Sequence, residues 1–344
     1  MGFYIMKKMK NILLSGFILL LTSCLEDVPV KENTYRENFN TLWEIIDTRY
    51  CFLDSKNINW DSVKLVYQAR LGTDTIDEIT FFDAMAEMLA VLKDGHVNLY
   101  SGFDRSRYWK WFTDFKPNFS SSLIYNQNYL GTNYRSVNGF RYNLIAGGEV
   151  GYLYYSSFSD SFSDQNMRYV IQYFKDCKGL IIDVRNNGGG SADLSSRLAS
   201  YFFTNDTVNL YIKHKTGPGH SDFSDFTPME TPAHEKIQWK RPVVVLSNRA
   251  AYSATNMFIA RMKDAPKATV IGDKSGGGGG LPLSNELPNG WMVRFSSSPM
   301  FDINKADIEN GILPDIVVSL DSTDMAKGRD SLIDYAVGLI TGIK

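Results

Sequence analysis

The chain has 344 residues, of which 44% are hydrophobic and 22% are charged, and its formal net charge is -2 at pH 7. This composition is typical of a folded globular protein, and the length allows one large domain with a smaller one beside it. Its 36 basic and 38 acidic residues form no basic stripe or charged tail, which argues against nucleic acid or an anionic membrane surface as a partner.

The first 24 residues have the pattern of an exported protein. Three lysines within residues 7–10 precede an apolar run over 12–21, and small residues lie directly before Cys24. The apolar run is short for a bilayer span, which takes about 20 residues. We interpret 1–24 as a bacterial lipoprotein signal with lipidation at Cys24, and 25–33 as a tether; an ordinary signal peptide or a short buried helix are the alternatives. The predicted location is the cell envelope, periplasmic or surface-exposed, with membrane attachment through the lipid alone.

Residues 34–99 are predicted to form a small helical region. Apolar residues recur at helical spacing over 34–51, after Asp61 and over 79–93. Methionine and aromatic side chains at this spacing are more typical of a core than of a ligand site. An Asp-Gly-His sequence that ends at His96 follows the third helix and comes directly before the start of a strand.

Residues 100–148 are rich in aromatic residues, Asn and Ser, and predict short strands and loops. Beyond them, nearly continuous apolar strands alternate with helical patterns, which indicates buried, largely parallel strands in an α/β fold. This core is predicted over 149–322, with a C-terminal helix over 323–344. Its strands are expected at 150–155, 179–184, 242–247 and 268–272.

Ser253 lies where a buried strand is followed by a small-residue turn and a helix. The ordinary role of a serine at this place is to cap the helix. A nucleophile needs the same place for another reason, because its side chain is exposed beyond the strand and the helix N–H groups favour a developing oxyanion. The position alone leaves both interpretations open.

Three consecutive glycines over 188–190 follow another apolar strand. They allow either a tight turn or a close backbone approach in which an N–H, most simply that of Gly188, points at a substrate carbonyl oxygen. The segment lacks the G-x-G-x-x-G spacing of a dinucleotide site. The Gly-Asp-Lys-Ser sequence over 272–275 lacks the glycine that a phosphate loop has before its lysine, so no nucleotide is predicted.

The remaining histidines and cysteines suggest no metal centre. His214, His220 and His234 lie in a polar segment without the spacing of a zinc motif, so we predict neither a metal ion nor another cofactor and expect a loop beside the cleft. Cys51 and Cys177 could form a disulfide in an exported protein or remain buried thiols.

Four segments occur in a fixed order: KGLIIDVRNNGGG over 178–190, NRAAYSATNMF over 248–258, VIGDKSGG over 270–277 and ENGILPDIV over 309–317. Together they resemble the tail-specific (C-terminal-processing) protease superfamily, and the helical region with the Asp-Gly-His element is similar to its tricorn-like branch. The resemblance implies a ClpP/crotonase-like core of repeated ββα units, preceded by the helical region, and the activity of a serine peptidase.

The resemblance also implies roles for single residues. Ser253 falls at the nucleophile of the family, and the backbone N–H groups of Gly188 and Ala254 would form the oxyanion hole. His96 and Glu309 match the histidine and glutamate of the tricorn-like branch. A serine needs a base within hydrogen-bond reach, and a carboxylate can orient an imidazole and stabilise its charged form. The alternatives are a turn histidine at 96 and a solvated charge at 309.

The chain departs from the family patterns at several positions. C-terminal-processing enzymes use a lysine base where this chain has Gly278, which leaves Lys274, four residues earlier, as the alternative base. The tricorn-like branch has a serine where this chain has Gly95. Residues 100–148 are too short for a complete PDZ module. The glycines over 276–280 are interpreted as backbone freedom at a cleft rim, where a peptide could add to a strand edge.

The sequence therefore predicts an exported serine endopeptidase that cleaves extended or C-terminal peptide segments through an acyl-enzyme on Ser253, with a peptide or protein as its partner. The alternative is a noncatalytic peptide- or lipid-binding lipoprotein on the same fold. A structural or assembly lipoprotein would explain the export signal but not the four core segments.

Overall fold

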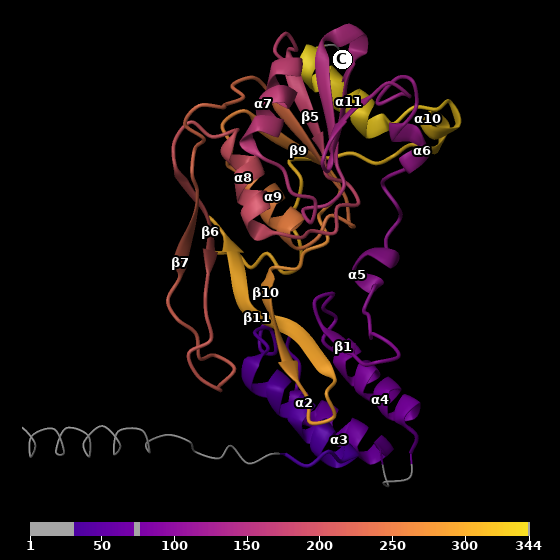
Figure 1. Ribbon diagram of the computed structural model, residues 1–344, viewed down its shortest axis with the longest axis vertical. Coiled ribbons are helices and arrows are strands. Elements are labelled where there is room, and N and C mark those ends of the chain that lie inside the picture. The colour runs from indigo at the N-terminus through magenta and orange to yellow at the C-terminus, as the bar shows by residue number, and fades with distance from the viewer. Residues whose placement is uncertain (1–30, 72–75, 343–344) are drawn as a thin grey trace, which may run out of the picture.

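The computed structural model describes residues 31–71 and 76–342 (Figure 1). The predicted lipoprotein signal, including Cys24, lies outside the described residues, as does the tether up to residue 30. Within the described ranges, every helix is too short or too polar to cross a bilayer.

A seven-stranded sheet forms the upper part of the molecule in Figure 1, with the strand order β12-β9-β8-β5-β4-β3-β2. The five strands from β12 to β4 are parallel, and β3 and β2 extend the sheet in antiparallel pairing. The predicted α/β fold with buried, largely parallel strands is confirmed. The strands are β2 Arg135–Val137, β3 Phe140–Ile145, β4 Val150–Tyr155, β5 Gly179–Asp183, β8 Val243–Ser247, β9 Ala268–Gly272 and β12 Ile316–Val317.

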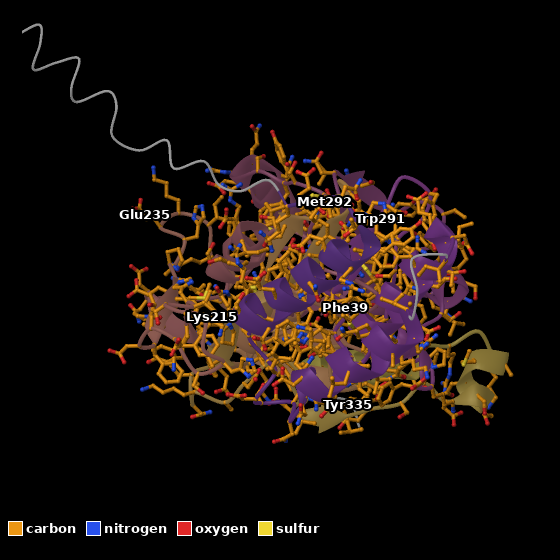
Figure 2. The ribbon with its side chains drawn as sticks, turned by 90° about the horizontal axis from the view of Figure 1, so that it is seen from below. Phe39, Lys215, Glu235, Trp291, Met292 and Tyr335 are labelled. Carbon is orange, nitrogen blue, oxygen red and sulfur yellow. The ribbon has the colours of Figure 1, made fainter. Side chains whose placement is uncertain are left out.

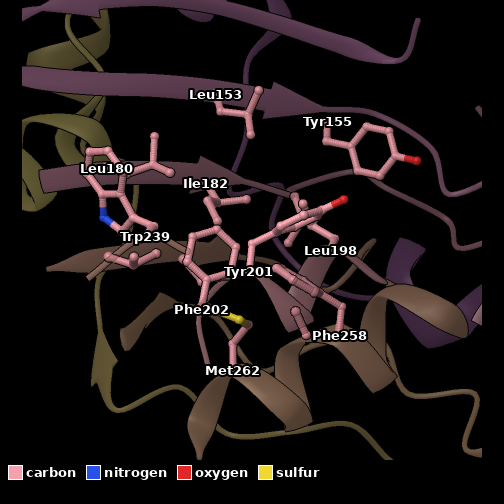
Figure 3. Packing of buried hydrophobic residues seen from close by; sticks show 14 of the residues in the cluster. Leu153, Tyr155, Leu180, Ile182, Leu198, Tyr201, Phe202, Trp239, Phe258 and Met262 are labelled. Atoms are coloured by element: carbon pink, nitrogen blue, oxygen red, sulfur yellow. The ribbon is translucent and has the colours of Figure 1, made fainter. Parts of the chain in front are cut away.

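Helices cover both faces of this sheet because alternate residues of each strand point to opposite sides. Leu180 and Ile182 of β5 pack with Phe258 and Met262 of the helix α9 in one core cluster (Figure 3), whereas Ile181 packs with residues of α11 in another. The helices are α7 Asp164–Tyr173, α8 Ala192–Ser200 and α9 Ala254–Lys263 in the first cluster, and α11 Ser331–Thr341 in the second.

Three helices form the end of the molecule opposite the seven-stranded sheet. They lie side by side as one layer, which faces the viewer in Figure 2. Thr34 and Asp77 begin the first and third of them by accepting hydrogen bonds from backbone N–H groups. Phe39 of the first helix belongs to a core cluster that also contains Val293 and Phe295 of a long strand. The helices are α2 Tyr35–Arg49, α3 Trp60–Leu71 and α4 Glu78–Ala90.

A second sheet joins the helical end to the α/β core. Its longest strand, β11, pairs with β1 and β10 over one part of its length and with β6 at its C-terminal end. In Figure 1, β10 and β11 lie between the two ends of the molecule. The strands are β1 Asn98–Tyr100, β6 Thr207–Ile212, β7 Thr227–Thr231, β10 Gly280–Glu286 and β11 Met292–Asp302.

The structure differs from the predicted boundaries at two places. The sheet begins with β2 and not at residue 149, because β3 pairs with β4 along its whole length. In place of the single C-terminal helix predicted over 323–344, the described residues up to 342 form two helices, since Gly328 has a φ of 71° and Asp330 caps a new helix start. Short helical segments also lie at α5 Lys110–Thr113, α6 Ser121–Ile124, η1 Ala146–Gly148 and α10 Ser322–Ala326.

The structure places the two remaining cysteines and the histidine-containing segment away from any group of metal ligands in the described residues. Cys51 and Cys177 are both buried free thiols. The loop between β6 and β7 reaches the helical end of the molecule, where a ring nitrogen of His220 lies 2.9 Å from Asp47. No group of three potential metal ligands comes together within residues 31–71 and 76–342.

Candidate active site

Ser253 lies at the turn between β8 and α9 in a backbone conformation that is rare for a residue with a side chain, with φ 59° and ψ -120°. Its N–H donates to the Gly277 carbonyl at 2.8 Å, and its side chain makes no capping hydrogen bond to the helix. Ser253 thus stands at the N-cap position of α9, but its side chain does not cap the helix. Strained backbone of this kind persists where the surrounding structure enforces it, often at functional sites.

His96 reaches Ser253 from the other end of the molecule. It lies in the loop between α4 and β1, and its Nε2 atom is 2.9 Å from Ser253 Oγ although 157 positions separate the two residues. The ring is buried, and the His96 N–H donates to Asp94 Oδ1 at 2.8 Å, which fixes the loop. A nucleophilic serine and a possible base are thus within hydrogen-bond distance.

The surroundings of His96 favour its neutral form. Burial lowers its pKa to about 4, and the charge of Asp94 opposes this shift only in part. At neutral pH the imidazole is therefore unprotonated, and Nε2 is available to accept the proton of Ser253.

The activity of this pair should consequently persist in mildly acidic solution. Because the base form of His96 is lost only near pH 4, we expect kcat/KM to fall with a midpoint near 4 and not near the ordinary value of 6.5. The unfolded chain binds this proton more tightly, so the contribution of His96 to stability decreases as the pH falls from 6.5 toward 4. A pH–rate profile measures the midpoint, and circular dichroism at each pH separates it from unfolding. A midpoint near 6.5 would show that the ring is solvated.

The candidate oxyanion hole lies against this turn. Gly189 has a φ of 98°, and a Cβ atom at this residue would lie 2.8 Å from the Ser253 Cβ and 3.0 Å from the Ala254 nitrogen, so only glycine fits. The neighbouring Gly188 lines the same pocket as Ser253. Within the described part of the chain, the N–H groups of Gly188 and Ala254 donate to no other group. Two free donors therefore lie beside the serine, as an oxyanion hole requires.

Glu309 is buried, but it contacts other groups than His96. Its Oε1 atom accepts a hydrogen bond from Lys56 Nζ at 2.8 Å, and its Oε2 atom accepts one from the Gly279 N–H at 2.9 Å. The Nδ1 atom of His96 is buried without a hydrogen-bond partner among the described residues. The structure thus brings Ser253 and His96 together, whereas no hydrogen bond joins His96 to Glu309.

Lys56 and Asp94 complete a buried charge cluster with Glu309. Burial and then the charge of Asp94 raise the pKa of Glu309 to about 8, against the effect of Lys56. Burial disfavours the Lys56 ammonium, but the charges of Asp94 and Glu309 outweigh it and raise the pKa of Lys56. Burial disfavours the Asp94 carboxylate, but the charge of Lys56 and hydrogen bonds from the His96 N–H and, at 2.8 Å, from Ser296 Oγ outweigh it and lower the pKa of Asp94.

Two members of this cluster, Lys56 and Asp94, were not among the predicted site residues. Asp94 stands two positions before His96, so its place in the same motif was a usable signal. Lys56 carries no comparable signal, since it is a single lysine in the turn after α2 whose Nζ also contacts Tyr50 Oη at 3.0 Å. Its partner Glu309 is 253 positions away, and only the folded chain reveals the contact.

Gly95 leaves room for aromatic side chains beside His96. A Cβ atom at Gly95 would lie 2.6 Å from Trp111 Nε1 and 2.9 Å from Tyr252 Oη. The two rings stack with their centroids 4.2 Å apart. They occupy the space into which the serine side chain of the tricorn-like branch would project, so that serine cannot be added without displacing them.

Gly95→Ser should therefore destabilise the protein. We expect the free energy of unfolding to fall by about 1–3 kcal/mol, because overpacking must displace the stacked rings. Gly102→Ser is the matched control, since a Cβ atom there meets nothing within 4 Å. Chemical denaturation of the two variants checks the expectation, and equal stabilities would contradict it.

The alternative lysine base lies elsewhere. Lys274 lines a separate pocket with Phe115, Arg249 and Asp273, whereas Ser253 lines another. A side chain at Gly278 would meet the Tyr252 ring at 2.5 Å, and this glycine has a φ of 78°. The structure thus favours His96 over a lysine as the partner of the serine.

A pocket of about 290 Å³ opens beside the Ser253–His96 pair. Its walls come from β1, the segment that follows β1, the glycine turn and β11. Aromatic and basic side chains predominate. They are Tyr100, Arg105, Arg107, Tyr108, Trp109, Trp111, Tyr252 and Arg294.

Residues 149–318 match peptidase family S41, and residues 31–90 match the tricorn protease C1 domain. The crystal structure of a candidate peptidase from Parabacteroides merdae ATCC 43184 is 46% identical in sequence, with a TM-score of 0.85 over 90% of this chain and 97% of that one. The chain belongs to peptidase family S41. The resemblance to the tail-specific protease superfamily is thereby confirmed.

Other proteins that the chain resembles are more distant. The carboxyl-terminal-processing protease of Synechocystis sp. (strain ATCC 27184 / PCC 6803 / Kazusa) is 27% identical over 206 residues, which cover 57% of this chain and 45% of the relative. This chain spans about half the length of the curated relatives that it matches. The crystal structure of mature CPAF shares the fold, with a TM-score of 0.68 at 13% identity over 90% of this chain and 98% of that one.

Proposed function

We propose that this protein is a serine endopeptidase that cleaves extended or C-terminal peptide segments through an acyl-enzyme on Ser253. The observation that carries the proposal is the 2.9 Å contact between Ser253 Oγ and His96 Nε2, with two free backbone donors beside it. An activated serine with adjacent oxyanion donors is the arrangement that acyl transfer needs.

The steps follow from these groups. His96 takes the proton of Ser253 as Oγ attacks the scissile carbonyl, and the oxyanion is held by the N–H groups of Gly188 and Ala254. The imidazolium returns the proton to the leaving amine, which leaves an ester on Ser253. Water then attacks the ester with the same base, and the peptide acid is released.

In this proposal Glu309 is the third member of the site and acts through the buried charge cluster. Asp94 carries a negative charge near His96 and so favours the imidazolium that forms during attack. Lys56 holds the Glu309 carboxyl at 2.8 Å, and the Gly279 N–H binds its other oxygen. Glu309→Gln is expected to lower kcat while the Ser253–His96 contact stays in place.

A fluorophosphonate probe tests the nucleophile. The purified protein is labelled beside Ser253→Ala and His96→Ala variants, and the expected result is labelling that both substitutions abolish. Labelling that persists in Ser253→Ala would refute the assignment. Loss in Lys274→Ala but not in His96→Ala would point to a Ser–Lys pair instead, and a folded wild type without any labelling would favour the noncatalytic binding protein.

We also propose that the protein is exported and anchored by lipid on Cys24. The support is the order of basic, apolar and small residues before this cysteine. Mass spectrometry of the N-terminus from native cells should find a diacylated residue at position 24 of the wild type, with no lipid in a Cys24→Ser variant. An unmodified Cys24 would end this proposal and leave the peptidase proposal untouched.

A further inference from the structure

The pocket beside Ser253 carries positive charge that no residue of its own lining balances. Arg105, Arg107 and Arg294 line it together with His96 and Ser253, and its lining contains no Asp or Glu. Three cations around a cleft focus a positive potential where the substrate must lie.

The sheet fixes the direction of Arg294. The residue lies on β11 opposite Asn98 of β1, and Asn98 also lines the pocket. Its strand neighbours Val293 and Phe295 are fully buried in the helical core cluster, so Arg294 projects from the opposite face. Ser296, on the same face, donates to Asp94 next to His96. A side chain placed by a strand in this way is held more firmly than one on a loop.

Arg294 is partly buried, and its guanidinium has no ion-pair or hydrogen-bond partner within the described ranges 31–71 and 76–342. Its charge is close enough to add to the effect of burial in lowering the pKa of His96, and to oppose in part the rise that burial causes in the pKa of Tyr252. A guanidinium offers five N–H donors in a planar fork that matches the two oxygens of a carboxylate. Arginine that faces a cleft without a partner is therefore suited to a ligand.

The other two arginines are exposed and form the mouth of the pocket. Arg105 lies over the ring of Tyr100, 5.7 Å from its centroid, and Arg107 has only a distant ion pair with Asp104 at 3.8 Å. Such exposed charges contribute more to attracting a substrate than to holding it. They would guide an anion toward Arg294.

We propose that this pocket binds a carboxylate of the substrate next to the scissile bond, with Arg294 as its direct ligand. The inference rests on the proposed peptidase function, because the pocket adjoins Ser253. A volume of about 290 Å³ accommodates a single residue more readily than a long segment. The carboxylate is supplied either by an Asp or Glu side chain or by the free C-terminus of the peptide.

Matched peptides distinguish the two sources. The full-length protein is given an equimolar library of peptides with randomised sequences. At each position the library contains matched members that carry either Glu or Gln, and every member is present with a free-acid and with an amidated C-terminus. We expect carboxylate-bearing members to be cleaved with at least about tenfold higher kcat/KM, since charge-assisted bidentate bonds are the strong ones. A loss on Glu-to-Gln exchange identifies the side chain, and a loss on amidation identifies the C-terminus.

Variants tie the preference to the arginine. Arg294→Gln should abolish the preference. Arg329→Gln is the control and should keep it, because Arg329 is exposed and does not line this pocket. Equal cleavage of acidic and neutral members by the wild type would overturn the inference. So would a preference that survives in Arg294→Gln.

A second measurement, made on the wild type alone, tests the inference even if Arg294→Gln does not fold. Carboxylate-bearing cleavage products should slow fluorophosphonate labelling of wild-type Ser253 more than their neutral analogues do, and equal protection would also overturn the inference. Absence of labelling in the folded wild type would instead refute the peptidase proposal itself.

Discussion

Ser253→Ala is expected to lower kcat by about a million-fold, to the level that substrate binding and the oxyanion donors provide without a nucleophile. The serine has no equivalent in the site, because the described contacts place only its Oγ atom at 2.9 Å from His96 Nε2. His96→Ala should lower kcat by about as much, since removing either member of a pair that acts as a unit removes the catalytic effect of both. Peptide hydrolysis under saturating substrate measures the loss.

Ser284→Ala is the control for this experiment. Ser284 lies exposed on β10, so its removal should leave both turnover and stability unchanged. The serine variant at 253 should also remain folded, because the side chain makes no capping hydrogen bond. A kcat that falls less than about a hundred-fold would mean that another group performs the attack.

Arg185→Met is expected to remove about 3–5 kcal/mol from the free energy of unfolding. Arg185 follows β5 and is fully buried, and its guanidinium lies 2.7 Å from Asp183 and 3.0 Å from Asp330. Loss of the cation leaves two carboxylates inside the protein without their counter-charge, which costs far more than an exposed ion pair. Urea denaturation followed by circular dichroism measures the change.

Arg329→Met provides the comparison on the surface. Arg329 is half-exposed and pairs with Asp324, so its replacement should cost no more than about 1 kcal/mol. Equal losses in the two variants would contradict the importance of burial. Because Asp330 begins α11 and Arg185 precedes the glycine turn, the Arg185 variant should also lose activity as the turn around Gly188 loosens.

The parts of the fold that could be predicted are those with a strong local pattern. The strands at 150–155 and 268–272 are nearly continuous apolar runs, and burial on both faces of a parallel sheet requires such runs. The hairpin of β10 and β11 was missed because its first strand, Gly280–Glu286, is largely exposed and begins with a glycine tract that is typical of a loop.

The candidate site was predictable to the same extent. Ser253 and Gly188 stand at strand ends, where the local sequence already indicates a turn, and His96 belongs to a short motif. The contact of Glu309 was not predictable, because its partner Lys56 comes from the helical region and meets it only after the two ends of the molecule have joined. Arg294 was missed for a similar reason, since a single charged residue in a half-buried strand is usually solvated.

The separation of His96 and Ser253 along the chain also orders events during synthesis. His96 belongs to the early, helical segment, Ser253 to the α/β core, and β11 pairs with strands on both sides. A nascent chain that ends before residue 302 has both side chains but lacks the complete strand that holds their two supports together. Proteolytic competence should therefore arise only after residue 302 has been synthesised and β11 can pair with both β1 and β6.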